Sequence, residues 1–146
     1  MKNKVLAFIY NQEKNEFLSL YSEPHPEHGE GGWFVVTGEM EKGETQEGAV
    51  RREVLEETGL EAIEILPLNW GSTYEWKGEE CLEMSYFVFV KSGKITLNEE
   101  HSKYEWLDIQ RFVERINWND DKRLLEKVLT LAINKGIYFN KKEREK

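Results

Sequence analysis

The segment Met84 to Val90 constrains the fold more than any other part of the sequence, because all of its residues except Ser85 are apolar. A strand without alternation of polar and apolar residues is typically buried on both faces. We therefore predict that this segment is a central strand of a sheet that other elements cover on both sides. Further strands are predicted at Val5–Tyr10, Phe17–Tyr21, Ala62–Leu68 and Glu105–Leu107. The first two are joined by a polar turn, which indicates a hairpin.

Two segments have the residue pattern of helices. Thr45 to Thr58 is helical, with Thr45 as the predicted N-cap and Gly59 as the left-handed residue that ends the helix. Asp120 to Asn134 is an amphipathic helix. Its apolar side consists of Leu124, Leu125, Val128, Leu131 and Ala132. A sheet with two helices predicts an α/β sandwich, of the α+β kind, with a mixed sheet.

The length of 146 residues predicts one domain, residues 1–140, followed by a charged tail, residues 141–146. No stretch approaches the roughly 20 apolar residues that cross a bilayer. The apolar run after Met1–Lys4 is too short for a signal peptide. We therefore expect a cytoplasmic monomer or homodimer that does not bind membranes.

Charge and composition exclude some kinds of site. The net charge of −8 disfavours binding to duplex nucleic acid, although carboxylates that hold a metal still permit a polyphosphate ligand. The single cysteine, Cys81, lies among apolar residues and is interpreted as a packed thiol rather than a catalytic one. His25, His28 and His101 are too dispersed along the chain to indicate a zinc site.

The first predicted helix carries Glu53, Glu56 and Glu57, whose spacing places three carboxylates on one helix face. Like charges in this arrangement repel one another, and a divalent cation would remove the repulsion. Magnesium prefers carboxylate oxygens and keeps coordination positions free for substrate phosphates. The alternative interpretation is a solvated acidic face, and the three glutamates alone do not decide between the two.

The surrounding residues favour the metal site, because Gly38 to Leu60 has the form G-x5-E-x7-R-E-U-x-E-E-x-G-U, where U is aliphatic. This segment resembles the signature of the Nudix hydrolase family. The resemblance implies an α/β/α sandwich with a mixed central sheet. It also implies a metal-dependent hydrolase, using Mg²⁺ or Mn²⁺, that cleaves a phosphoanhydride bond of a nucleotide.

The resemblance also implies residue roles. Glu53, Glu56 and Glu57 would bind the metal and polarise water, with Arg52 as their electrostatic brace. Glu44 would be an outer metal ligand or would orient a neighbouring side chain. The alternative for Glu44 is a charge at the helix N-terminus that the helix dipole favours.

Thr37-Gly38 stands where many family members have a glycine pair, and a backbone carbonyl here often joins the metal shell. The β-branched Thr37 restricts the backbone, which bears on the shape of the substrate pocket. Farther along, Glu100 opens the pattern E-H-x-x-Y-x-W, which resembles a region of several Nudix subgroups in which this glutamate faces the metals. Glu53 and Glu100 are both candidates for the general base, and a solvated loop charge is the alternative for Glu100.

The substrate is less constrained. Thr37-Gly38 and Asn117-Trp118 look similar to small bacterial enzymes that act on dATP or dihydroneopterin triphosphate, which favours a nucleoside triphosphate. A diadenosine tetraphosphate hydrolase and a non-catalytic ligand sensor are the alternatives. Aromatic side chains that could stack on a base, or belong to the core instead, are Trp33, Tyr74, Trp76 and Trp118.

Overall fold

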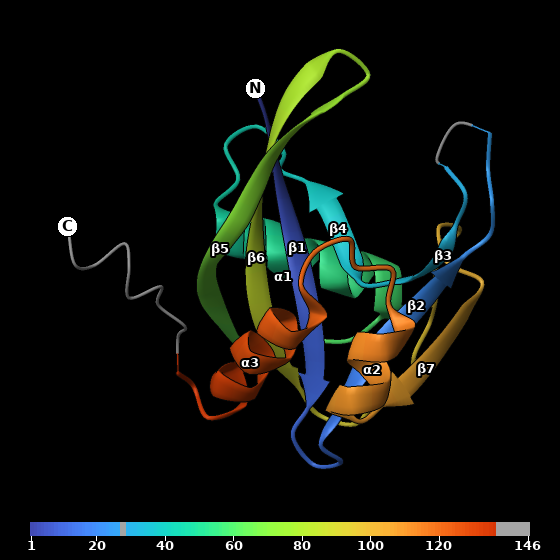
Figure 1. Cartoon of the computed structure of the whole chain (residues 1–146), viewed down its shortest axis with the longest axis vertical. Coiled ribbons are helices and arrows are strands. Elements are labelled where there is room, and N and C mark those ends of the chain that lie inside the picture. Colours follow the sequence, from blue (N-terminus) through green and yellow to red (C-terminus); the bar gives the residue numbers. More distant parts are fainter. Residues whose placement is uncertain (27–28, 137–146) are drawn as a thin grey trace.

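The structure is a computed structural model that describes residues 1–26 and 29–136 (Figure 1). The predicted tail, residues 141–146, and the predicted domain end at residue 140 lie outside these described residues. The described elements are β1 (Lys2–Asn11), β2 (Glu16–Ser22), β3 (Gly32–Phe34), β4 (Val36–Glu39), α1 (Gln46–Thr58), β5 (Glu64–Trp76), β6 (Glu79–Val90), β7 (Lys103–Leu107), α2 (Ile109–Arg115) and α3 (Lys122–Ile133).

The strands form one mixed sheet in the order β3-β2-β1-β6-β5, with β4 paired to β1 and β7 paired to β2. The pairing of β1 with β6 is parallel, and the other pairings of named strands are antiparallel. The apolar segment Met84–Val90 lies in β6, between β1 and β5. The prediction of a central, doubly covered strand is therefore confirmed.

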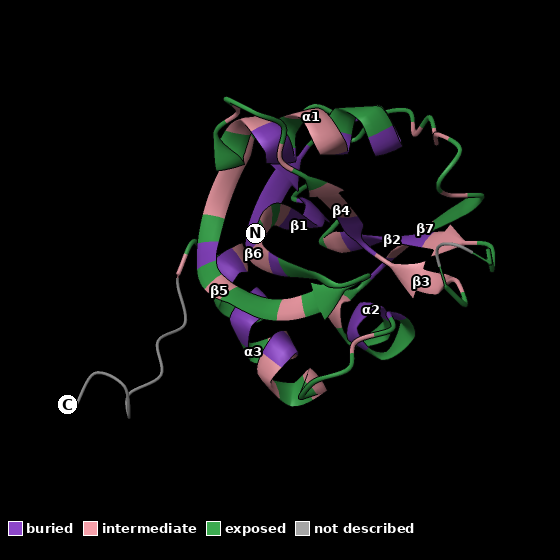
Figure 2. Ribbon diagram, turned by 90° about the horizontal axis from the view of Figure 1, so that it is seen from above, coloured by how far each residue is buried: buried purple, intermediate pink, exposed green. Residues whose placement is uncertain are grey.

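Alternate residues of β1 belong to two separate hydrophobic cores. Leu6 and Phe8 lie in a core with side chains of α2 and α3, whereas Val5 and Ala7 lie in a second core with side chains of α1. Figure 2 shows the resulting layers, with α1 on one side of the sheet and α2 and α3 on the other. The predicted α/β/α sandwich is confirmed.

The sheet divides along β1. At its C-terminal end β1 pairs with β2, through Tyr10 with Phe17, as the predicted hairpin requires. At its N-terminal end, Lys4 to Ala7 pair instead with β4, while β2 pairs with β3 and β7. The strand β4 therefore leads from the sheet directly toward α1, whose residues carry the predicted metal site.

The structure corrects three details. A third helix, α2, was not predicted, because its seven residues are too short to show a helical period; its Phe112 stacks on Phe17 with ring centroids 4.9 Å apart. The strands β5 and β6 extend beyond the predicted Ala62–Leu68 and Met84–Val90 into a long hairpin. On α3, Leu129 is fully buried and Leu131 is 38% exposed, whereas the prediction placed Leu131 on the apolar side and omitted Leu129.

No helix in residues 1–26 and 29–136 is long and apolar enough to cross a membrane. Cys81 is a buried free thiol in β6, where it pairs with Tyr74 of β5.

Candidate active site

The helix α1 is fixed at both ends by the residues that the sequence predicted. The Thr45 side chain accepts a hydrogen bond from the Gly48 backbone N–H at 3.0 Å. Gly59 has a left-handed conformation, with φ of 78°, and its N–H donates to the carbonyl of Leu55. The buried side of the helix packs Val50 and Val54 against the sheet. These contacts hold the carboxylates of α1 in a fixed position relative to β4.

Arg52 connects the parts of the acidic site. Its guanidinium donates to both carboxylate oxygens of Glu44, at 2.7 and 2.9 Å, and to Glu53 at 2.7 Å. It also donates to the carbonyl of Glu39 at the end of β4 and to Glu56 at 3.3 Å. Bidentate pairs of this kind fix geometry as well as charge. Arg52 therefore joins α1 to β4 and neutralises part of the acidic cluster.

Glu44 lies at the start of α1 and is held by Arg52. Hydrogen bonds from Arg52, and then from the Glu41 backbone N–H, lower the pKa of Glu44 to about 2. The carboxylate is thus ionised and occupied by these donors. This geometry supports the predicted role in which Glu44 orients a neighbouring side chain.

Gly38 and Glu53 are packed against each other. A Cβ atom at Gly38 would collide with the carboxyl group of Glu53, so the close approach of α1 to β4 requires glycine at this position. Thr37, the neighbouring residue that departs from the glycine pair, is half-buried and pairs with Leu6 of β1.

Glu57 is the most buried carboxylate of the site, with 1% of its surface exposed. Its Oε1 atom lies 3.6 Å from Nδ1 of His101. Burial, followed by interactions with Glu53 and Glu100, raises the pKa of Glu57 to about 11. Burial also lowers the pKa of His101, against the opposing effect of Glu100. The loop before β7 therefore meets the end of α1 in a buried environment that favours the uncharged forms of Glu57 and His101.

The three predicted helical carboxylates occupy different environments. The Glu53 and Glu57 side chains are 13% and 2% exposed, whereas Glu56 is 55% exposed and pairs with Arg52. Glu57 is buried because α1 packs this side of the helix against the loop that contains His101.

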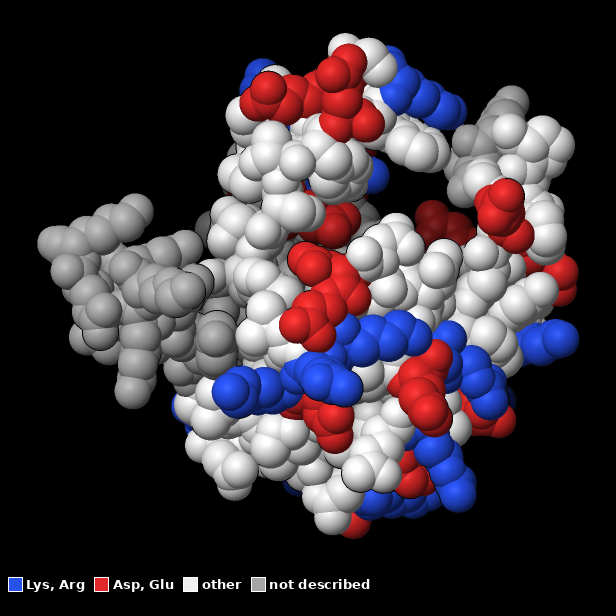
Figure 3. Space-filling view, in the orientation of Figure 1, with Lys and Arg blue, Asp and Glu red and all other residues white. Residues whose placement is uncertain are grey.

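A cleft of about 600 Å³ opens at this site. Its lining includes the predicted residues Thr37, Gly38, Arg52, Glu53 and Glu100, together with Glu39, Met40, Glu41 and Lys42. Figure 3 shows a hollow between the β5–β6 hairpin and the β3–β4 side of the molecule, with acidic side chains at its rim and within it. A band of Lys and Arg side chains crosses α2 and α3, away from the hollow.

The residues of this site fit a hard divalent cation. Glu53, Glu57 and Glu100 offer carboxylate oxygens, which magnesium and manganese prefer. Two buried atoms, Oε2 of Glu57 and Nδ1 of His101, have no hydrogen-bond partner within the part of the chain that the structure describes. Buried polar atoms normally have one, and a cation between these groups would meet that requirement.

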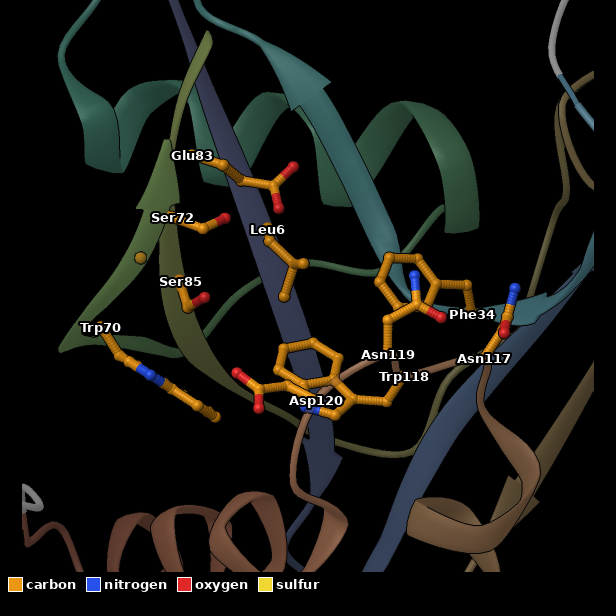
Figure 4. A pocket seen from close by; sticks show the side chains of 11 residues that line it. Leu6, Phe34, Trp70, Ser72, Glu83, Ser85, Asn117, Trp118, Asn119 and Asp120 are labelled. Atoms are coloured by element: carbon orange, nitrogen blue, oxygen red, sulfur yellow. The ribbon is translucent and has the colours of Figure 1, made fainter. Parts of the chain in front are cut away.

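A second cavity, of about 370 Å³, lies on the α2–α3 side of the sheet (Figure 4). Leu6 forms part of its floor, and the rings of Trp70 and Trp118 are 5.5 Å apart. Trp118 also contacts Phe34, with centroids 6.2 Å apart. The polar groups of the lining come from Ser72, Glu83, Ser85, Asn117, Asn119 and Asp120. Apolar walls with a few convergent polar groups are typical of a small-molecule site.

The structure separates the four aromatic residues that were candidates for stacking on a base. Trp118 lines the second cavity. Trp33 instead packs against Tyr21, with Arg115 over its ring. Tyr74 donates to Glu83 at 3.4 Å near this cavity, and Trp76 is 45% exposed on the β5–β6 hairpin. The other three are not among the residues that line the cavity.

Sequence reasoning missed Trp70, Phe34, Glu83 and Asp120 as parts of this cavity. Each comes from a different part of the chain, and no local spacing connects them. One signal was present in the sequence. The mostly polar segment Asn117 to Asp121 lies between α2 and α3, and the Trp118 side chain within it faces the cavity.

The NUDIX domain family model matches residues 2–128 of the chain. The NAD-capped RNA hydrolase NudC of Photobacterium profundum is 36% identical over 83 residues, which cover 56% of this chain and 30% of that protein. An oxidized purine nucleoside triphosphate hydrolase of Danio rerio is 31% identical over 94 residues, covering 64% of this chain and 60% of that one. The chain thus spans about a third of the NudC relative's length.

The solved structure of the E. coli dihydroneopterin triphosphate pyrophosphohydrolase has a TM-score of 0.69 and 23% identity to this chain, and the match covers 88% of this chain and 94% of that one. This likeness concerns the fold. The family match, which covers most of the chain, shows that the chain belongs to the Nudix hydrolase family.

Proposed function

We propose that the protein is a metal-dependent hydrolase of a nucleoside triphosphate, with the base in the aromatic cavity and the phosphates in the acidic cleft. The observation that carries the proposal is a cross-strand pair: Leu6 lines the cavity, Thr37 lines the cleft, and the two are register partners in β1 and β4. Such partners have Cα atoms about 4.5–5.5 Å apart. One ligand of nucleotide size therefore reaches both regions.

The carboxylates of the cleft would hold the cation through Glu53, Glu57 and Glu100. A divalent cation there neutralises phosphate charge and makes water more acidic. We assign the proton acceptor to Glu53, because it faces the cleft and its carboxylate is fixed by Arg52 at 2.7 Å and by contact with Gly38. A fixed carboxylate within reach of the attacking water is the geometry that general-base catalysis requires.

The base would stack on the cavity-facing side of Trp70 or Trp118, because these two rings contact each other, with centroids 5.5 Å apart, and leave no space for a base between them. An aromatic pair offers stacking energy to any nucleobase, on the order of 1–3 kcal/mol. The Danio rerio relative, named for oxidized purine nucleoside triphosphates, and the E. coli structure, named for dihydroneopterin triphosphate, support a triphosphate linked to a bicyclic base.

The decisive experiment is a substrate panel with magnesium or manganese: dATP, dGTP, their oxidised forms, dihydroneopterin triphosphate, diadenosine tetraphosphate and NAD. We expect a triphosphate to yield a monophosphate and pyrophosphate. In oxygen-18 water, attack at the α-phosphorus places the label in the monophosphate. Rapid cleavage of the dinucleotide with negligible triphosphate turnover would overturn the substrate assignment, and no hydrolysis of any compound would favour a ligand-sensing module.

A further inference from the structure

We propose that Nδ1 of His101 is a metal ligand, so that a cation beside Glu100 of the acidic cleft is held in a mixed nitrogen–oxygen shell by Glu57, Glu100 and His101. The inference rests on the proposed function only in requiring a divalent cation. It adds a nitrogen donor to a site whose other donors are carboxylates.

The distances fit a single ion. One ligand atom from each of Glu57, Glu100 and His101 can be chosen so that all three lie within 4.8 Å of one another, and Nδ1 is 3.6 Å from Oε1 of Glu57. Around an octahedral ion with bonds of about 2.1 Å, neighbouring ligand atoms are about 3.0 Å apart and opposite ones about 4.2 Å. The 3.6 Å separation lies within this range and the 4.8 Å limit lies somewhat above it, so small side-chain movements would close the shell.

The burial of these groups points to a ligand as well. The side chains of His101 and Glu57 are 7% and 2% exposed. Nδ1 of His101 and Oε2 of Glu57 both lack a hydrogen-bond partner among the described residues. A direct hydrogen bond between the imidazole and Glu57 is excluded in this geometry, because 3.6 Å is too long for one. A cation between them would satisfy both groups at once.

The loop holds the two neighbouring side chains in position. The Glu100 backbone N–H donates to the Asn98 side chain at 3.1 Å, and the Ser102 N–H donates to the carbonyl of Tyr21 in β2 at 2.9 Å. Ser102 is therefore tied to the sheet, and Glu100 is tied to Asn98 within the loop. These hydrogen bonds hold the loop so that the His101 imidazole lies beside Glu57 at the end of α1.

A nitrogen ligand has a consequence for the choice of ion. Imidazole suits transition metals, whereas magnesium favours oxygen donors. The wild-type chain is therefore expected to prefer Mn²⁺ over Mg²⁺, and replacing His101 should reduce that preference. We expect His101→Gln to weaken Mn²⁺ binding by about tenfold or more, with a smaller loss for Mg²⁺.

A different role for His101 would be that of a positioning residue, whose N–H orients Glu57 without contacting the ion. Metal affinity alone does not separate these roles, because losing either would weaken binding. Nitrogen coordination does separate them, since only a ligand atom transfers spin density from a bound paramagnetic ion.

The test is pulsed electron paramagnetic resonance of Mn²⁺ bound to the full chain, without nucleotide. We expect a ¹⁴N modulation typical of imidazole in the wild type and in the control His25→Gln, and its loss in His101→Gln. Absence of the modulation from the wild type overturns the proposal whether or not any variant folds. Persistence of the modulation in folded His101→Gln also overturns it.

The outcomes distinguish this inference from the proposed function. Nitrogen coordination without turnover of any nucleotide would sustain the His101 ligand and refute the hydrolase. Nucleotide hydrolysis without nitrogen coordination would sustain the hydrolase and refute the ligand.

Discussion

The acidic cleft and the aromatic cavity meet at the Leu6–Thr37 pair but are built in different ways. Most of the cleft comes from one stretch of chain, from Thr37 to Glu53, and the loop with Glu100 completes it. The cavity takes its lining from strands β1, β3, β5 and β6 and from the segment before α3. The difference teaches that the chemistry of this protein is encoded locally, whereas the shape of its substrate pocket depends on the whole fold.

The two regions should therefore respond differently to substitution. Changes in the cleft remove charges that act on the reacting phosphate, so they lower kcat. Changes in the cavity remove contacts to a part of the substrate that does not react, so they raise KM. A cleft substitution that mainly raised KM, or a cavity substitution that mainly lowered kcat, would contradict this difference.

The largest effect is expected for Glu57→Gln. Glutamine keeps the size of the side chain but removes a charge that the metal requires, and kcat should fall by at least about 100-fold, since even groups that only orient metal ligands contribute about 10–100-fold. Steady-state kinetics at saturating magnesium measures this. The exposed Glu61→Gln on the loop after α1 is the matched control and should retain normal turnover. Near-normal turnover of the Glu57 variant would contradict the metal-site assignment.

Only part of the cleft could be predicted from the sequence. The caps Thr45 and Gly59 and the glutamates of α1 follow from residue types at fixed spacing, and the structure places them as expected. The burial of Glu57 could not be predicted, because the same i, i+4 spacing suits an exposed face equally well. The nearness of His101 depends on the loop before β7, more than forty residues away in the chain.

The cavity was largely beyond prediction from sequence. Trp118 was a candidate because of its neighbour Asn117, but Trp70, Ser72, Glu83 and Ser85 reach the cavity only through the long β5–β6 hairpin. The bulge between Pro67 and Gly71 shifts the pairing of β5 beside Trp70. Such a shift changes which side chains face the sheet surface, and nothing in the local sequence specifies it.

The next effect concerns stability. A cation that binds only the folded chain raises the free energy of unfolding by about 2.7 kcal/mol at 100 times its dissociation constant. Thermal unfolding should therefore shift upward with millimolar Mg²⁺ or Mn²⁺ and return with chelator. The shift should largely disappear in Glu57→Gln and persist in the cavity variant Trp118→Leu. An equal shift in both variants would show that the ion binds elsewhere.

A smaller effect is expected in the cavity itself. Trp118→Leu removes a ring that stacks on the proposed base, which is worth about 1–3 kcal/mol, or roughly 5- to 150-fold in KM. The value of kcat should change little. Trp33→Leu is the control, because Trp33 packs against Tyr21 and Arg115 outside the cavity lining. A large rise in KM for Trp33→Leu, with none for Trp118→Leu, would indicate that the base binds near Trp33 of β3 and not in the cavity.

The smallest effect is a pH dependence that belongs to the metal-free cleft. Burial, together with Glu53 and Glu100, raises the pKa of Glu57 from 4.5 to about 11. Between these two pH values Glu57 is protonated in the folded chain and ionised in the unfolded chain. A raised pKa stabilises the fold fully below pH 4.5, and the stabilisation is lost as the pH rises toward the folded value. In chelator, the free energy of unfolding should fall by up to about 1.4 kcal/mol for each pH unit.

Denaturant unfolding at pH 6.5 and 7.5 in chelator measures this slope. Glu57→Gln should have a flatter slope, because glutamine does not titrate, whereas Trp118→Leu should retain the slope of the wild type. Saturating metal should reverse the trend, since the ion binds the deprotonated carboxylate and its affinity rises with pH. A wild-type slope equal to that of Glu57→Gln would mean that this carboxylate is already ionised in the metal-free chain. The cleft would then be preformed for the cation, and metal binding would release no proton from Glu57.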